Sequence, residues 1–71
     1  ELVEVTLAES SPAKDKALSE LQFPRSATVV AIVRDERVLV PDKATVLRVG
    51  DEVMALISED AEAAVQKILV G

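Results

Sequence analysis

The sequence predicts a small α+β domain in which a mixed or antiparallel sheet packs with two helices. Three observations lead to this fold class. Alternating apolar residues open the chain, two segments have helical spacing, and residues 29–58 hold apolar runs separated by a charged turn, a proline and a Gly-Asp pair. We therefore expect the order strand, helix, strand, strand, an optional short strand, strand and helix.

The first strand is predicted over residues 2–8, LVEVTLA, because its apolar residues alternate with polar ones. A helix is predicted next, since Ser10-Ser11-Pro12 combines a serine N-cap with a proline at the first helical position. Pro24 disfavours a helical residue before it, so this helix should end by Gln22 or Phe23. Its apolar face is predicted to consist of Ala13, Ala17, Leu18 and Leu21.

A long strand is predicted over Thr28–Arg34, a β-branched run that is apolar on both faces. Such a strand is expected to be covered on both faces. Asp35-Glu36 is interpreted as a two-residue turn without the favoured Asn-Gly chemistry, and Arg37–Val40 as the returning strand. Pro41 ends that strand, and a polar loop, Asp42-Lys43, follows.

A tight corner is predicted before the last strand. Thr45–Leu47 is expected to form a very short strand, and Gly50 is the only glycine inside the chain. A lone Gly followed by Asp between apolar segments indicates a positive φ angle. Asp51 is interpreted as a brace for this corner, because a catalytic carboxylate would need a partner acid or base and none is supplied.

The last two elements are a strand over Glu52–Ile57 and a C-terminal helix. Ser58 or Asp60 is expected to cap this helix. The acidic residues near its N-terminus are expected to stabilise it through the helix dipole. Its buried stripe is predicted to consist of Ala61, Ala64, Val65, Ile68 and Leu69.

Composition restricts the function. The chain has 71 residues, and a domain of this size has a marginal core that usually needs a disulfide, a metal or a partner surface. It contains neither Cys nor His, which leaves a partner surface and argues against an enzyme. The aliphatic composition favours burial of flat faces between subunits. We interpret residues 1–71 as a single domain cut from a longer protein.

Charge and hydropathy argue against two kinds of partner. The net charge of −5 and the single aromatic residue are unfavourable for nucleic-acid binding. Every apolar run is interrupted by charges, so no direct membrane insertion is expected.

The charged clusters have two interpretations each, a binding site or a structural role. Arg34 and Arg37 could clamp a phosphate or carboxylate, but pairing with Asp35, Glu36 or another exposed acid is favoured. Acidic groups at 35–36, 51–52 and 59–62 offer oxygen ligands for a hard cation. They lack the ligand spacing of a calcium loop, so turn and helix-end roles are favoured and no metal site is predicted.

Three segments together resemble the C-terminal domain of RCK proteins (regulators of conductance of potassium), a family also called TrkA-C. They are SPAKDKALSELQFP after the opening strand, VVAIVRDERVLVPDKATVLRVGDEVMALIS, and EDAEAAVQKIL. The most specific parts are the Ala31–Arg34 segment, Pro41, and Thr45 through Gly50-Asp51. Each is short, and their order and spacing carry the resemblance over essentially the whole chain.

The resemblance implies a homodimer. It also implies a cytoplasmic location at the inner face of the membrane, reached through a parent protein that contains a Rossmann-type RCK domain and acts with a membrane transport subunit. The expected function is a regulatory, ligand-sensing and dimerisation domain of a potassium or other cation transport protein. The alternatives are a purely structural dimerisation module and a divalent-cation-sensing module of a channel or antiporter.

No cofactor is expected in this segment, but the resemblance implies a small regulatory ligand between paired domains. The positions implied for it are Phe23, Arg25, Thr28 and Pro41. Phe23 has an alternative role, which is to cover the end of the first predicted helix. Some family members bind cyclic di-AMP, and those carry Asn where this chain has Thr28. The resemblance therefore indicates a ligand without specifying this dinucleotide.

Overall fold

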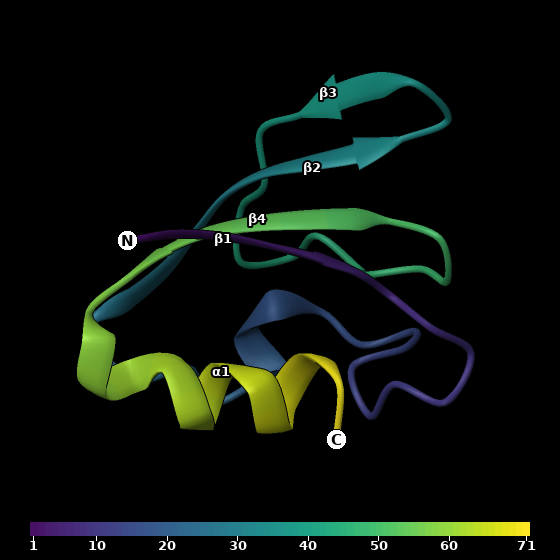
Figure 1. Ribbon diagram of the computed structural model, residues 1–71. Coiled ribbons are helices and arrows are strands. Elements are labelled where there is room, and N and C mark those ends of the chain that lie inside the picture. The colour runs from purple at the N-terminus through teal and green to yellow at the C-terminus, as the bar shows by residue number, and fades with distance from the viewer.

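Four strands form one antiparallel sheet in the computed structural model, which describes residues 1–71 (Figure 1). They are β1 (Leu2–Thr6), β2 (Ala27–Arg34), β3 (Arg37–Leu39) and β4 (Glu52–Ile57), and their order in the sheet is β1-β4-β2-β3. All three strand pairs are antiparallel, so the sheet is antiparallel and not mixed. The predicted α+β class is confirmed.

The register of the sheet places the two longest pairings on either side of β4. Leu2 lies opposite Leu56 on one side, and Ala27 lies opposite Ile57 on the other. The β2–β4 register shifts between Val29 and Ala31, which is a β-bulge. The Asp35-Glu36 turn is present as predicted. Both of its residues have positive φ angles, 51° and 65°, as a type I′ hairpin turn requires.

The predicted first helix is wrong. Residues 9–10 and 12–15 form turns, and only a single 3-10 turn, Leu18–Glu20, follows. Asp15 has a φ angle of +61°, which interrupts any right-handed helix at that point. The Ser11 hydroxyl accepts a hydrogen bond from the Ala13 N–H at 3.1 Å, so the expected serine cap exists, but it closes a turn.

Tertiary pairing explains why this helix does not form. The backbone of residues 15–19 is hydrogen-bonded to the backbone of residues 43–47: the N–H groups of Asp15, Leu18 and Ser19 donate to Leu47, Thr45 and Lys43. The Leu47 N–H donates to Lys16 in return, at 2.9 Å. The predicted short strand at 45–47 is reduced to one bridge between Val46 and Ala17. Helical spacing alone cannot reveal such a distant partner.

The C-terminal helix consists of a 3-10 turn, Glu59–Ala61, and α1, Glu62–Leu69. Ala61, Val65 and Leu69 are buried as predicted, Ile68 is half-buried, and Ala64 is exposed, against the prediction. α1 covers one face of the sheet (Figure 1). The core between them also includes Leu7, Ala13, Ile32, Leu47, Val53, Ala55 and Ile57. No helix of the structure has the length and apolarity that a membrane span requires.

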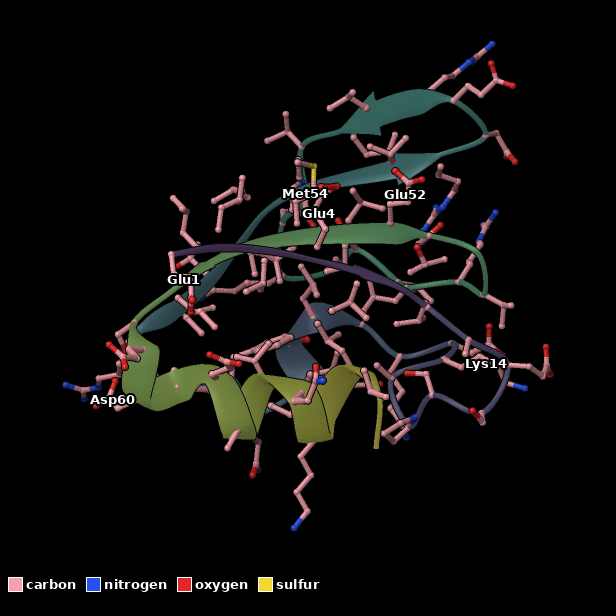
Figure 2. All side chains as sticks on the ribbon, viewed as in Figure 1. Glu1, Glu4, Lys14, Glu52, Met54 and Asp60 are labelled. Atoms are coloured by element: carbon pink, nitrogen blue, oxygen red, sulfur yellow. The ribbon has the colours of Figure 1, made fainter.

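The opposite face of the sheet, here called the outer face, has no helix over it. Figure 2 shows Glu4, Met54 and Glu52 directed away from α1 on this face. Register places the following residues on it too: Leu2, Thr28, Ala31, Val33, Val38 and Leu56. Leu56 is 51% exposed and Val38 is 70% exposed. The expectation that β2 is covered on both faces therefore does not hold within one chain, because the fold provides only one helical layer.

Candidate ligand-binding groove

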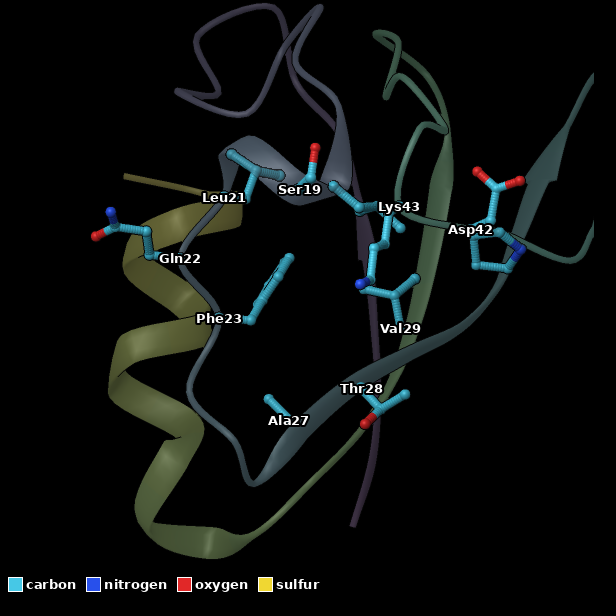
Figure 3. A pocket seen from close by; sticks show the side chains of 11 residues that line it. Ser19, Leu21, Gln22, Phe23, Ala27, Thr28, Val29, Asp42 and Lys43 are labelled. Atoms are coloured by element: carbon cyan, nitrogen blue, oxygen red, sulfur yellow. The ribbon is translucent and has the colours of Figure 1, made fainter.

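An open groove of about 620 Å³ lies beside the first half of β2 (Figure 3). Three segments form it: the 3-10 turn and the loop after it, the start of β2, and the loop after β3. Its lining consists of Leu18, Ser19, Leu21, Gln22, Phe23, Ala27, Thr28, Val29, Pro41, Asp42 and Lys43. The volume is in the range of small-molecule sites.

The groove exists because β3 is short. β3 pairs only with Ile32, Val33 and Arg34, so the earlier part of β2 has no strand partner on that side. Pro41 then ends the strand register, since it has no N–H to donate. The chain turns away through Asp42 and Lys43, and its backbone is held to the 3-10 turn by the Ser19 N–H, which donates to the Lys43 carbonyl at 3.0 Å.

The groove is apolar at its floor and polar at its rim. Phe23, Leu18, Leu21, Ala27 and Val29 are half-buried and pack against the core. Figure 3 shows the Phe23 ring facing the open space between the two loops. Hydrogen-bonding and charged groups at the rim come from Ser19, Gln22, Thr28, Asp42 and Lys43.

Three of the four residues implied as ligand-binding meet in this groove. Phe23, Thr28 and Pro41 line it, although the chain separates them widely. Arg25 does not line it, because it is exposed in the turn that the Ala27 N–H closes by donating to the Pro24 carbonyl at 3.0 Å. The contribution of Lys43 and of the 3-10 turn was missed. Lys43 had a sequence signal, since it follows Pro41 in a polar loop.

A second polar site, the Gly50-Asp51 corner, is closed. Gly50 has a φ angle of +90°, as predicted. Asp51 is 1% exposed, and its carboxylate accepts hydrogen bonds from Arg34 Nε at 2.9 Å, Arg34 Nη2 at 2.7 Å and the Arg48 N–H at 2.9 Å. Arg34 Nη2 also donates to the Val46 carbonyl at 2.7 Å. The partner of Arg34 is thus a buried acid and not the exposed one that was expected.

The ionisation of this pair follows from its contacts. Burial by itself raises the pKa of Asp51, but the hydrogen bonds from Arg34 and Arg48 and the charge of Arg34 outweigh it, so the pKa lies below its ordinary value. The hydrogen bond to Asp51 also raises the pKa of the Arg34 guanidinium. Both carboxylate oxygens of Asp51 accept hydrogen bonds from residues of the corner and from Arg34, which indicates a structural role for the corner. The acidic groups at the turns do not assemble into a cluster of three metal-ligand side chains.

A four-stranded antiparallel sheet with one helical layer, an open groove and an uncovered apolar face defines a small α+β domain. The chain belongs to the TrkA-C domain family, whose model matches residues 2–70. The predicted resemblance is therefore confirmed.

Curated relatives carry the same domain within longer chains. The chain is 38% identical over 69 residues to the Trk system potassium uptake protein TrkA of Mycobacterium tuberculosis, covering 97% of this chain and 31% of that protein. It is 32% identical over 68 residues to the TrkA homolog 2 of Methanosarcina mazei, covering 96% and 15%. The chain thus spans less than a third of the length of these relatives.

Solved structures share the fold. The RCK_C domain dimer of S. agalactiae BusR, solved in complex with c-di-AMP, is 27% identical with a TM-score of 0.80, covering 96% of this chain and 88% of that chain. An RCK domain at 23% identity has a TM-score of 0.77, covers 94% of this chain and 96% of that chain, and shows the fold alone.

Proposed function

We propose that this chain is a regulatory domain of a potassium transport protein, in which two copies pair and a small ligand binds in the groove beside β2. The carrying observation is the groove itself, whose lining includes Phe23, Thr28 and Pro41. The ligand would act by favouring one arrangement of the paired domains over another. This requires that the ligand make different contacts with the protein in the two arrangements.

Cyclic di-AMP is the first ligand to test. The BusR relative was solved as an RCK_C dimer with c-di-AMP at 27% identity. The groove offers what an adenine ring needs, namely the face of Phe23 and the ring of Pro41 as apolar walls. Thr28 supplies a hydroxyl in place of the amide that cyclic di-AMP binders of the family carry.

The outer face is the proposed pairing surface, and its occupant is a second copy of this chain. Its aliphatic residues remain exposed because no helix covers them. A chain of 71 residues has a marginal core, so burying this face would contribute to stability as well as to assembly. The dimeric state of the BusR relative supports this occupant.

The parent protein and its location belong to the same proposal. The length of the potassium uptake relatives supports a longer parent chain. The Rossmann-type RCK domain, the membrane transport subunit and the cytoplasmic location are added to the proposal from what the family resemblance implies. Residues 1–71 would be one domain of that chain, without a catalytic role.

Isothermal titration calorimetry of the domain with cyclic di-AMP tests the ligand. We expect saturable binding, which Phe23→Ala weakens about tenfold or more because it removes the aromatic wall. Cyclic di-GMP, ATP and Ca²⁺ serve as comparison ligands. Binding of none of them would reject ligand sensing and favour a purely structural dimerisation module, whereas saturable binding of Ca²⁺ alone would favour the divalent-cation sensor.

Sedimentation of the domain tests the pairing surface. Leu56→Glu should convert the dimer to a monomer, because a charge on the outer face would be buried without a partner. The matched control is Val70→Glu, since Val70 is 47% exposed at the end of α1 and away from this face. Equal behaviour of the two variants would show that the outer face is not the interface.

A further inference from the structure

The outer face carries two acidic side chains among its apolar ones. Register places Glu4 of β1 opposite Met54, and Glu52 of β4 opposite Thr6. Both glutamates are exposed, and Figure 2 shows them directed away from α1. The surface that is proposed to pair with a second copy therefore already carries charges of the kind that Leu56→Glu would add.

The two carboxylates are diagonal neighbours in the sheet. Glu4 faces Met54, which lies two positions along β4 from Glu52. Diagonal neighbours on one face of an antiparallel pair lie about 7 Å apart, a separation that long side chains span. Two negative charges at such a separation repel each other.

No basic side chain is paired with either glutamate. The ion pairs of the structure are Lys14 with Glu9 and Arg34 with Asp51. The Arg34 guanidinium lies on the other side of the sheet, where it donates to the buried Asp51 carboxylate. The other register positions of the outer face hold uncharged residues: Leu2, Thr6, Thr28, Ala31, Val33, Val38, Met54 and Leu56. No helix packs on this face, so no charged group of another element faces the two carboxylates.

Pairing would bring two such faces together. The negative charge would be doubled within one interface and partly removed from water, and both effects oppose association. A carboxylate that is removed from water binds a proton more readily than one in water, because burial disfavours its charged form. The apolar side chains of the outer face therefore favour pairing, whereas the two glutamates limit it.

We infer that Glu4 and Glu52 form an electrostatic restraint on pairing, which is released when their carboxylates are protonated or screened by salt. The paired state takes up protons that the separate copies do not bind, so a fall in pH shifts the equilibrium toward the pair. The inference rests on the proposed pairing surface and adds to it a response to pH and to ionic strength.

Sedimentation equilibrium tests the inference by measuring the dissociation constant of the pair. The wild type is compared with Glu4→Gln/Glu52→Gln, which keeps the length of both side chains and removes their charge. The matched control is Glu59→Gln/Glu62→Gln, which neutralises two exposed acids at the start of the C-terminal helix. Because the chain has a net charge of −5, this control separates a local effect of the outer face from a general loss of negative charge.

We expect Glu4→Gln/Glu52→Gln to lower the dissociation constant about tenfold at neutral pH, and the control to lower it much less. A change from about pH 7.5 to about pH 5.5 should strengthen pairing of the wild type and the control about fivefold, and that of Glu4→Gln/Glu52→Gln much less. Added salt should strengthen wild-type pairing more than that of Glu4→Gln/Glu52→Gln, because ions screen the repulsion.

Two results would overturn the inference while Leu56→Glu still dissociates the pair and so supports the pairing surface. One is an equal dissociation constant for the wild type and Glu4→Gln/Glu52→Gln, and the other is equal strengthening by the control. Monomers of every variant at each pH and salt concentration would reject the pairing surface and the restraint together. A monomeric wild type beside a Glu4→Gln/Glu52→Gln variant that pairs would support the restraint.

Discussion

The β3–β4 connection has a charged residue at each end, and the two ends differ in how the fold treats that charge. At the Gly50-Asp51 corner, the carboxylate is buried and accepts hydrogen bonds from Arg34 and Arg48. At the groove, Lys43 is exposed, has no ion pair, and shares the lining with apolar side chains. The paired carboxylate stabilises the folded chain, whereas an unpaired charge beside an apolar surface remains available to a ligand.

Removal of the corner carboxylate should give the largest effect on stability. Asp51→Ala leaves Arg34 half-buried without its partner, and we expect a loss of about 3 kcal/mol in the free energy of unfolding, measured with urea. The neighbouring Glu52→Ala, at an exposed position, should change it by less than about 0.5 kcal/mol. If Asp51→Ala does not fold, the double replacement Arg34→Met/Asp51→Leu should restore folding, because it removes both charges. A structural role of the corner would be contradicted if this double variant also failed to fold. It would also be contradicted if Asp51→Ala and Glu52→Ala lowered the free energy of unfolding equally.

Acid should remove the same interaction. The pKa of Asp51 is lowered in the folded state from its ordinary value of 3.8, so its contribution is complete above that value and is lost as the pH falls through the folded pKa. The stability difference between wild type and Asp51→Asn should therefore be largest near neutral pH and shrink below about pH 3.8. Urea unfolding across this range measures it, and a constant difference would exclude the linkage.

The backbone of the corner should contribute less. Gly50 has a φ angle of +90°, and an added Cβ would meet no atom within 4 Å. Gly50→Ala should therefore cost about 1–2 kcal/mol from backbone strain alone, without a steric clash. Thermal unfolding provides the measurement, with Gly50→Asn as the milder comparison. If Gly50→Ala left the stability to thermal unfolding unchanged, the backbone of the corner would be able to relax.

The hairpin between Arg34 and Arg37 can be improved. Asp35 and Glu36 occupy positive φ angles that Asn and Gly adopt more readily. The double replacement Asp35→Asn/Glu36→Gly should stabilise the domain by about 0.5–1 kcal/mol in urea unfolding. The control Glu36→Ala keeps a Cβ at positive φ and should not stabilise the fold.

The groove end should give the smallest effect on stability. Lys43→Gln should change the free energy of unfolding by less than about 0.5 kcal/mol, because no ion pair is lost. A change comparable with that of Asp51→Ala would remove the distinction between the two ends of the connection.

Local patterns were sufficient for most of the sheet. β4 was predicted with its observed bounds, and β1 and β2 to within two residues, since alternation and β-branched runs are local signals. The Asp35-Glu36 turn and the positive φ of Gly50 were also accessible, because turn chemistry depends on a few adjacent residues. Ala64 was placed on the wrong face, since helical spacing does not show how wide the buried stripe is.

Local patterns failed where backbone groups have distant partners. The spacing of residues 13–21 favoured a helix, yet the segment forms turns and one 3-10 turn, and its backbone is hydrogen-bonded to residues 43–47. Arg34 was expected to pair with an exposed acid, and its partner is a buried one 17 positions away. The ligand groove depends on this same pairing, so only part of its lining could be predicted.

The sequence by itself determined the family, the strands and the corner, because periodicity, turn residues and an unusual glycine act over a few positions. The tertiary structure decided which residues share the groove, which charge is paired, and which sheet face is uncovered. The physical reason is that hydrogen bonds and ion pairs between distant segments compete with local propensity, and their free energy depends on the three-dimensional position of the partner.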